Sequence, residues 1–169
     1  MTKRSPPRAR RRVPGRSGDP AARAIQALRR GLALIKAEGG APDRVRRDQA
    51  CEIVSRLAHV PVAMLVADNR GRYVDANEAA AFLTGYTRAE LLRRSVWDLT
   101  PDAHRGRGQA LWRAFLMRQR MSGWYPLRKK NGRIANARYA AIANVLPGLH
   151  VSALATPSVV RQFRRNTHR

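Results

Sequence analysis

An unbroken apolar run, a turn and a second short apolar stretch follow one another near the middle of the chain. The run covers residues 62–67, which is about the length of one strand. Asp68-Asn69-Arg70-Gly71 comes next, and its Asn and Gly tolerate a positive φ at low cost. Tyr73 then begins a second apolar stretch. The pattern therefore predicts a β-hairpin.

Helix-end signals follow this hairpin. Asn77 precedes an alanine-rich segment whose free amides its side chain can cap, and Gly85 stands where a left-handed C-terminal residue is expected. Thr87 and Glu90 have the spacing of a capping box, with the carboxylate three residues after the hydroxyl. Two short consecutive helices are therefore predicted.

A longer helix and three strands are predicted in the second half. Thr100-Pro101-Asp102 is a helix-start signal, with Thr100 as the cap, and the helical spacing of apolar residues becomes regular from Gln109. The strands are expected at residues 123–128, 134–145 and 149–155. The 134–145 strand is rich in alanine, which either leaves room for a ligand or admits a helix closely.

Two amphipathic helices are predicted ahead of the hairpin, in residues 19–59. Their apolar positions are Ile25, Leu28, Leu32 and Ile35 in the first, and Val45, Ile53, Val54 and Leu57 in the second. Each helix must cover its apolar stripe. The open face of the sheet and the same helices of a second protomer are both candidates, so packing within a monomer and dimerisation stay open.

Charge is placed unevenly along the chain, whose net charge is +23. Residues 1–18 contain seven cations, several prolines and glycines and no acid, which predicts a disordered basic tail. Residues 157–169 form a second basic tail. Such a field attracts polyanions and weakens with salt. A solvated arginine-rich surface without any partner explains the same composition.

Composition also indicates a compartment. The single cysteine, Cys51, excludes an internal disulfide and favours a reducing environment. No apolar run approaches the roughly 20 residues of a membrane span. The charged N-terminus lacks the apolar core of a secretory signal. A cytoplasmic protein without membrane association is therefore expected.

The order of the central signals resembles the PAS domain family. The matching residues are Asp68, Gly71, Asn77, Ala79, Gly85, Tyr86, Glu90 and Leu91, and the basic run that ends in Asn131-Gly132 resembles the family's late hairpin, with Asn in place of Asp. The resemblance covers residues 60–156. It implies an α+β fold with a PAS-like five-stranded antiparallel sheet and flanking helices, preceded here by the two amphipathic helices of residues 19–59.

The resemblance leaves two interpretations for the apolar residues between sheet and helices. They line a small-molecule pocket, or they are plain hydrophobic core. Our candidates for the pocket lining are Met64, Val66, Phe82, Trp97, Leu111 and Phe115.

Basic and aromatic residues suggest a second kind of site. The polyanion-binding candidates are Arg10, Arg11, Arg12, Arg128, Lys129, Lys130 and Arg133, with Arg138 beside them. Trp112, Trp124 and Tyr125 are candidates for stacking on bases, although core or interface packing is the simpler explanation of each. No base-reading motif is evident, so any nucleic-acid binding is expected to be non-specific.

The sequence contains no motif for catalysis or metal binding, so a non-enzymatic protein is expected. The four histidines show no metal-ligand spacing with Cys51 or with one another. Flavin-binding relatives carry a cysteine after the Glu90-like helix, and its absence from residues 93–97 argues against a flavin adduct. Haem-binding relatives carry a histidine on the long helix, and the only candidate, His104, lies at the helix start, which argues against haem. Other cofactors stay open.

The resemblance implies a non-enzymatic sensory or signal-transduction module that binds a small ligand or a protein partner. It would signal through its flanking helices, through a homodimer or partner contact at residues 19–59, with regulation of transcription as one output. The 13 residues after Thr156 are too few for a kinase or cyclase, so the signal is expected to pass to another protein. The alternative is a nucleic-acid-associated basic protein that uses a PAS-like scaffold and binds non-specifically through its basic tails.

Overall fold

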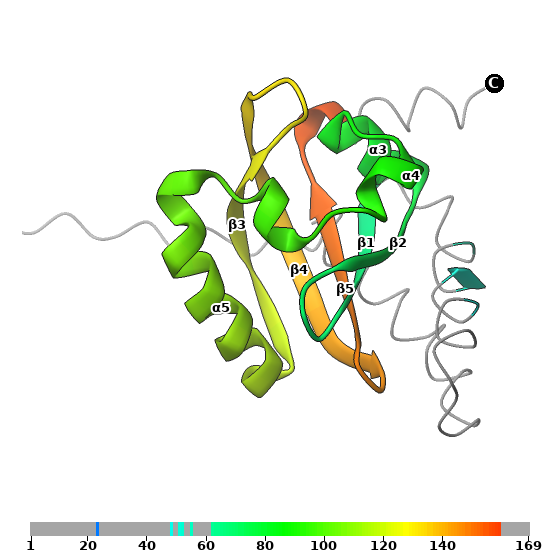
Figure 1. Ribbon diagram of the computed structural model, residues 1–169, viewed down its shortest axis with the longest axis vertical. Coiled ribbons are helices and arrows are strands. Elements are labelled where there is room, and N and C mark those ends of the chain that lie inside the picture. Colours follow the sequence, from blue (N-terminus) through cyan, green and yellow to red (C-terminus); the bar gives the residue numbers. More distant parts are fainter. Residues whose placement is uncertain (1–22, 24–47, 49–50, 53–54, 56–61, 160–169) are drawn as a thin grey trace, which may run out of the picture.

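Figure 1 shows the computed structural model, which describes residues 62–159 and the separate helical residues Arg23, Asp48, Cys51, Glu52 and Ser55. The predicted basic tail at residues 1–18, with Arg10, Arg11 and Arg12, lies outside the described residues. So do residues 160–169 and the apolar positions of the two N-terminal helices. These parts of the sequence interpretation stay predictions.

Five antiparallel strands form one sheet in the order β2-β1-β5-β4-β3, which confirms the predicted sheet. They are β1 (Ala63–Asp68), β2 (Tyr73–Ala76), β3 (Arg120–Arg128), β4 (Ile134–Leu146) and β5 (Leu149–Ala155). The bounds of β5 are those predicted, and the other strands differ by one to three residues at an end. Strand β1 pairs with β5 over six residues, so the first and last strands along the chain are hydrogen-bonded neighbours within the sheet.

The pairing register places alternate strand residues on two faces of the sheet. The inner face carries Leu65 of β1, which pairs with Ser152 of β5, and it faces the helices. The outer face carries Met64 and Val66, and Val66 pairs with Val151. All three of these outer residues are buried as well. The 62–67 segment is therefore apolar throughout because both of its faces exclude water.

Asn77 fastens the first helix to the central strand. Its Oδ1 accepts hydrogen bonds from the Ala80 N–H at 3.0 Å, which caps α3 (Glu78–Thr84), and from the Met64 N–H at 2.9 Å. Its Nδ2 donates to the Val62 carbonyl at 3.0 Å. One buried amide thus satisfies groups of both elements, which confirms the predicted cap and explains why an asparagine is needed here.

Gly85 and Thr87 set the next turn. Gly85 ends α3 with φ of 77°, the left-handed conformation that glycine adopts at low cost. Thr87 opens α4 (Arg88–Leu91) through a reciprocal capping box, in which the Thr87 N–H donates to Glu90 Oε2 and the Glu90 N–H donates to Thr87 Oγ1. These predicted helix ends are confirmed.

The segment after α4 departs from the prediction. Two 3-10 turns, η1 (Val96–Leu99) and η2 (Asp102–His104), precede α5 (Arg105–Arg118). Helix α5 begins four residues before Gln109, and Thr100 is not its cap, because the Thr100 hydroxyl donates to the Val96 carbonyl at 2.7 Å. Helix α5 runs beside β3 and packs on β3 and β4 (Figure 1).

Candidate ligand cavity

A cavity of about 100 Å³ lies between the inner face of the sheet and the segment from η1 to α5. It is lined by Val96, Leu99, Gly108, Leu111, Trp112 and Phe115 on the helical side, and by Leu65, Ala67, Tyr73, Met121, Tyr125, Leu127, Tyr139, Ala141, Ser152 and Leu154 on the sheet side. The lining on the sheet side follows the two-residue period of the strands. None of these lining side chains is charged.

Hydroxyl groups supply the polarity of the cavity. The Thr100 hydroxyl uses its proton on the Val96 carbonyl, so in its short contact with Tyr125 the Tyr125 hydroxyl must be the donor. The Tyr125 oxygen therefore keeps acceptor capacity. Burial raises the pKa of Tyr125, although the Thr100 hydrogen bond lowers it, and burial also raises the pKa of Tyr139. Both phenols are neutral near pH 7 and can bond to an uncharged ligand.

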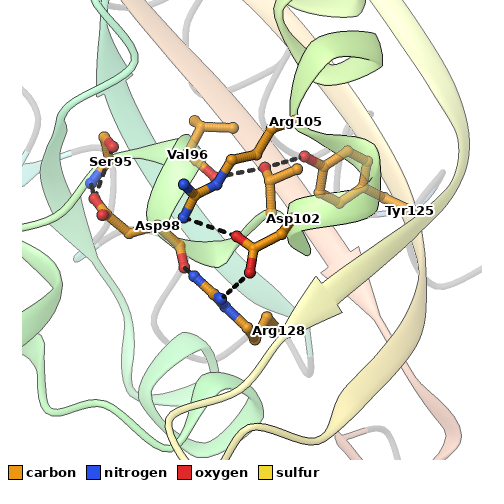
Figure 2. Close-up of polar contacts among 8 residues, drawn as sticks. Ser95, Val96, Asp98, Asp102, Arg105, Tyr125 and Arg128 are labelled. Carbon is orange, nitrogen blue, oxygen red and sulfur yellow. Dashed lines mark hydrogen bonds and ion pairs between the residues drawn. The ribbon is translucent and has the colours of Figure 1, made fainter.

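A polar network connects this wall of the cavity to the surface, as Figure 2 shows. Arg128 on β3 donates to the Asp98 carbonyl at 3.2 Å and to Asp102 Oδ2 at 3.3 Å, and Arg105 of α5 pairs with Asp102 Oδ1 at 3.1 Å. The Asp98 carboxylate caps η1 by accepting from the Ser95 N–H and hydroxyl. Burial raises the pKa of Asp98, but the hydrogen bonds from Ser95 outweigh it and hold the pKa below its usual range.

His150 closes the end of the sheet beside the cavity. The Asn144 N–H donates to His150 Nδ1 at 3.0 Å, so the proton of the neutral ring lies on Nε2, which donates to Asn69 Oδ1 at 2.9 Å. The ring packs edge-on against Trp112 and Phe115, with centroid distances of 5.5 Å and 5.8 Å. Burial lowers the pKa of His150, so the imidazole is the neutral link between the β1–β2 turn and the β4–β5 hairpin.

The family model described as PAS fold matches residues 57–145, which is more than half of the chain. The chain belongs to the PAS fold family. PAS domains are sensory and signal-transduction modules and commonly mediate protein interactions. No curated protein sequence matches the chain.

Solved PAS domains share the fold at low sequence identity. A domain of a sensory box sensor histidine kinase/response regulator from Geobacter sulfurreducens has a TM-score of 0.52 and 19% identity, and the match covers 69% of this chain and 100% of that one. A PAS domain from Colwellia psychrerythraea has a TM-score of 0.55 and 16% identity, with 63% and 94% covered. A PAS domain of a LuxR-family transcriptional regulator from Burkholderia thailandensis, solved with ethanol, has a TM-score of 0.52 and 16% identity, with 62% and 96% covered.

Two of the six predicted lining residues, Leu111 and Phe115, line the cavity of this PAS domain. Met64 and Val66 do not, because their positions in β1 face the outer side of the sheet. Phe82 is 48% exposed on α3. These three side chains therefore do not line this cavity.

Trp97 does not line this cavity either. Its indole packs against Gly71 and edge-on against Trp112, with ring centroids 6.1 Å apart, and it lies outside the cavity lining. A Cβ added at Gly71 would lie 3.5 Å from the Trp97 ring nitrogen. Trp97 therefore supports the wall of the cavity from behind.

The residues that sequence reasoning missed are the hydroxyls of the inner face, above all Tyr139 and Ser152. Tyr125 was a candidate for base stacking, with core or interface packing as the simpler explanation, and the register of β3 turns it inward. Trp112 also faces the cavity, and its indole N–H donates to the Asn69 carbonyl at 3.2 Å. Only Trp124 of the three predicted stacking residues is exposed. Strict alternation of side chains along β3 and β4 was the signal that could have distinguished the inward-facing from the exposed aromatic residues.

The predicted basic patch is partly neutralised. Lys130 Nζ lies 2.7 Å from Glu90 Oε1, and Arg128 is engaged with Asp102. Lys129 and Arg133 flank the hairpin turn, where the Lys129 N–H donates to the Arg133 carbonyl at 2.8 Å. Of these four cations, two are therefore held by carboxylates of the same chain.

The chemistry of the lining fits neither a flavin adduct nor a ligated haem, since the side chains around the cavity include no cysteine and no histidine. His104 lies in η2, at the start of the helical segment and away from the lining. Within residues 62–159 and the five separate helical residues, no group of three metal-ligating side chains comes together. No helix in the described part of the chain is long and apolar enough to cross a membrane.

Proposed function

We propose that this chain is a non-enzymatic PAS sensor whose cavity binds a small, uncharged, mainly apolar molecule with one hydroxyl. The observation that carries the proposal is a mainly apolar, uncharged lining interrupted by the hydroxyl-bearing residues Tyr73, Tyr125, Tyr139 and Ser152. An ion would lose its hydration there without gaining a counter-charge, which excludes charged ligands on energetic grounds. An engineered cavity of about 150 Å³ holds benzene, so about 100 Å³ suits a short alcohol or a small ring.

The same lining supports a sensory role over catalysis. It presents no carboxylate, imidazole or thiol that could serve as a general base or nucleophile. The ethanol complex of the LuxR-family PAS domain is a precedent for a ligand of this size in the same fold.

A route from the cavity to the surface supports signalling. A ligand hydroxyl that accepts the Tyr125 proton competes with Thr100, which holds η1 through the Val96 carbonyl. Movement of η1 changes the position of the Asp98 carbonyl, which accepts a hydrogen bond from Arg128. The change would pass to a second protomer or a protein partner through residues 19–59, in the cytoplasm and with transcription as one output.

A titration of the full-length ¹⁵N-labelled protein with ethanol and with phenol tests the proposal. Saturable amide shifts should concentrate at Tyr125 and Ser152. Tyr125→Phe should weaken binding by about fivefold to tenfold, the worth of one hydrogen bond. The matched control is Tyr86→Phe, because the Tyr86 ring stacks under Arg94 away from the cavity. Shifts that do not saturate, or equal affinity in Tyr125→Phe, would contradict a ligand site here.

A second candidate function, association with polyanions, has its own observation. Residues 103–159 contain ten cations and no carboxylate. The basic tails would add to this field, and binding should weaken steeply with salt. Deletion of residues 1–18 should lower the affinity for a single-stranded oligonucleotide, and an unchanged affinity would exclude a role of that tail.

A further inference from the structure

The outer face of the β3–β4 hairpin carries an exposed aromatic ring beside an arginine. Trp124 pairs directly with Arg138, and the register that turns Tyr125 and Tyr139 inward turns this pair outward. The Trp124 side chain is 65% exposed. The Arg138 guanidinium carbon lies 5.8 Å from the ring centroid, within the range of a cation–π contact that orients the indole.

The two strands that carry this pair contain charged side chains of one sign only. Arg120 lies on the same outer face, four residues before Trp124, and it is exposed. All six carboxylates of residues 62–159 precede Ala103, so α5, β3, β4 and β5 contain none. We call Trp124, Arg138 and Arg120 the β3–β4 platform.

The platform fits an anionic partner with flat, accessible rings. A second copy docked through the same surface would place arginines against arginines, with no carboxylate from these strands to offset them. A duplex hides the faces of its bases within the stack, whereas a single strand offers both bases and phosphates. We propose that the platform binds single-stranded nucleic acid, with a base stacked on Trp124, whose ring Arg138 orients, and with a phosphate at Arg120.

This inference deepens the second candidate function, and its test separates the two. Fluorescence anisotropy would measure binding of the full-length protein to a labelled oligothymidine and to an abasic strand of equal length. Trp124→Ala should weaken oligothymidine binding about tenfold or more, the usual worth of a stacked base. The wild type should bind the abasic strand about as weakly, and Trp124→Ala should no longer distinguish the two strands. Phe82→Ala removes an exposed aromatic ring on α3 and is the matched control.

Further variants complete the design. Arg120→Gln should reduce the slope of log affinity against log salt by about one, while Trp124→Ala should leave that slope unchanged. Because Trp124 is exposed, its variant should keep the wild-type melting temperature, which shows that the fold is intact.

If the wild type binds oligothymidine and the abasic strand equally, the proposed base stacking on the platform is wrong, and binding is by charge alone. Unchanged oligothymidine affinity in Trp124→Ala would overturn it too, even if deletion of residues 1–18 abolishes binding and so upholds the role of the tail. A dimer that depends on Trp124 and persists in excess oligothymidine would show that a second copy covers this face instead.

Discussion

Replacing Ala141 by leucine tests whether the cavity is usable space. Ala141 lies on the inner face of β4, pairs with Met121 and Ser152, and packs beside Phe115. Its methyl group already lines the cavity. The three added carbon atoms therefore extend into the empty volume instead of into packed side chains.

The expected gain follows from the cavity volume. Filling most of 100 Å³ recovers about 2 kcal/mol at roughly 24 cal/mol per Å³. Burial of three further carbons gives a similar figure, about 2.4 kcal/mol. These are two measures of one effect, and the loss of leucine rotamer freedom opposes it by about 0.5–1 kcal/mol. We expect Ala141→Leu to raise the free energy of unfolding by about 1–2 kcal/mol and to abolish ligand binding.

Urea unfolding of wild type and variant would measure this gain as a shift in midpoint at constant slope. The melting temperature should rise by roughly 5–10 °C. Ala143→Leu is the control, because Ala143 is buried in the same cluster but does not line the cavity, and overpacking there should cost about 1–3 kcal/mol. If Ala141→Leu destabilises the protein as much as Ala143→Leu does, the cavity is too small or too constrained to admit a ligand.

Three further predictions concern the polar groups that hold the fold. Asn77→Ala should lower the free energy of unfolding by about 3 kcal/mol, because it removes a helix cap and leaves the buried Met64 N–H without an acceptor. The control Asn131→Ala, in an exposed turn, should cost far less. The Lys130 hydrogen bond, aided by the Thr87 amide, lowers the pKa of Glu90 to about 2. The stability that the ionised Glu90 contributes is therefore present above pH 4.5 and is lost as the pH falls toward 2. Lys130→Gln should raise the pKa of Glu90 in a carboxyl NMR titration. Burial lowers the pKa of His150 below 6.5, so at lower pH the unfolded chain binds a proton that the folded chain does not. The free energy of unfolding should therefore fall as the pH drops below 6.5. His150→Gln should make the urea midpoint less dependent on pH between about pH 7.5 and 5.5.

Local signals in the sequence were sufficient for turns and helix ends. Asn77, Gly85 and the Thr87–Glu90 box act on backbone groups within a few residues, so their effect does not depend on distant parts of the chain. The start of α5 shows the limit of this reasoning. Thr100 has the sequence context of a cap, but its hydroxyl is taken by Val96 and Tyr125, the second of which is 25 residues away.

The face of a strand was the main uncertainty. In residues 62–67 every side chain is apolar, so the sequence offers no alternation from which to assign a face. Met64 and Val66 were candidates for the pocket lining, and the register places them on the outer face. In β3 the pairing with β4 separates Trp124 from its neighbour Tyr125 and gives one to the surface and the other to the cavity.

The sequence by itself determined the family, the antiparallel sheet, the helix caps and the surplus of positive charge, because each of these depends on residue type and short-range order. Only the tertiary structure decided which hydroxyls meet in the cavity, which cations Glu90 and Asp102 neutralise, and which tryptophan reaches the surface. These outcomes depend on contacts between residues far apart in the chain, such as Glu90 with Lys130 and Asn69 with His150. Such contacts are fixed by strand register and helix packing, which residue identity alone does not specify.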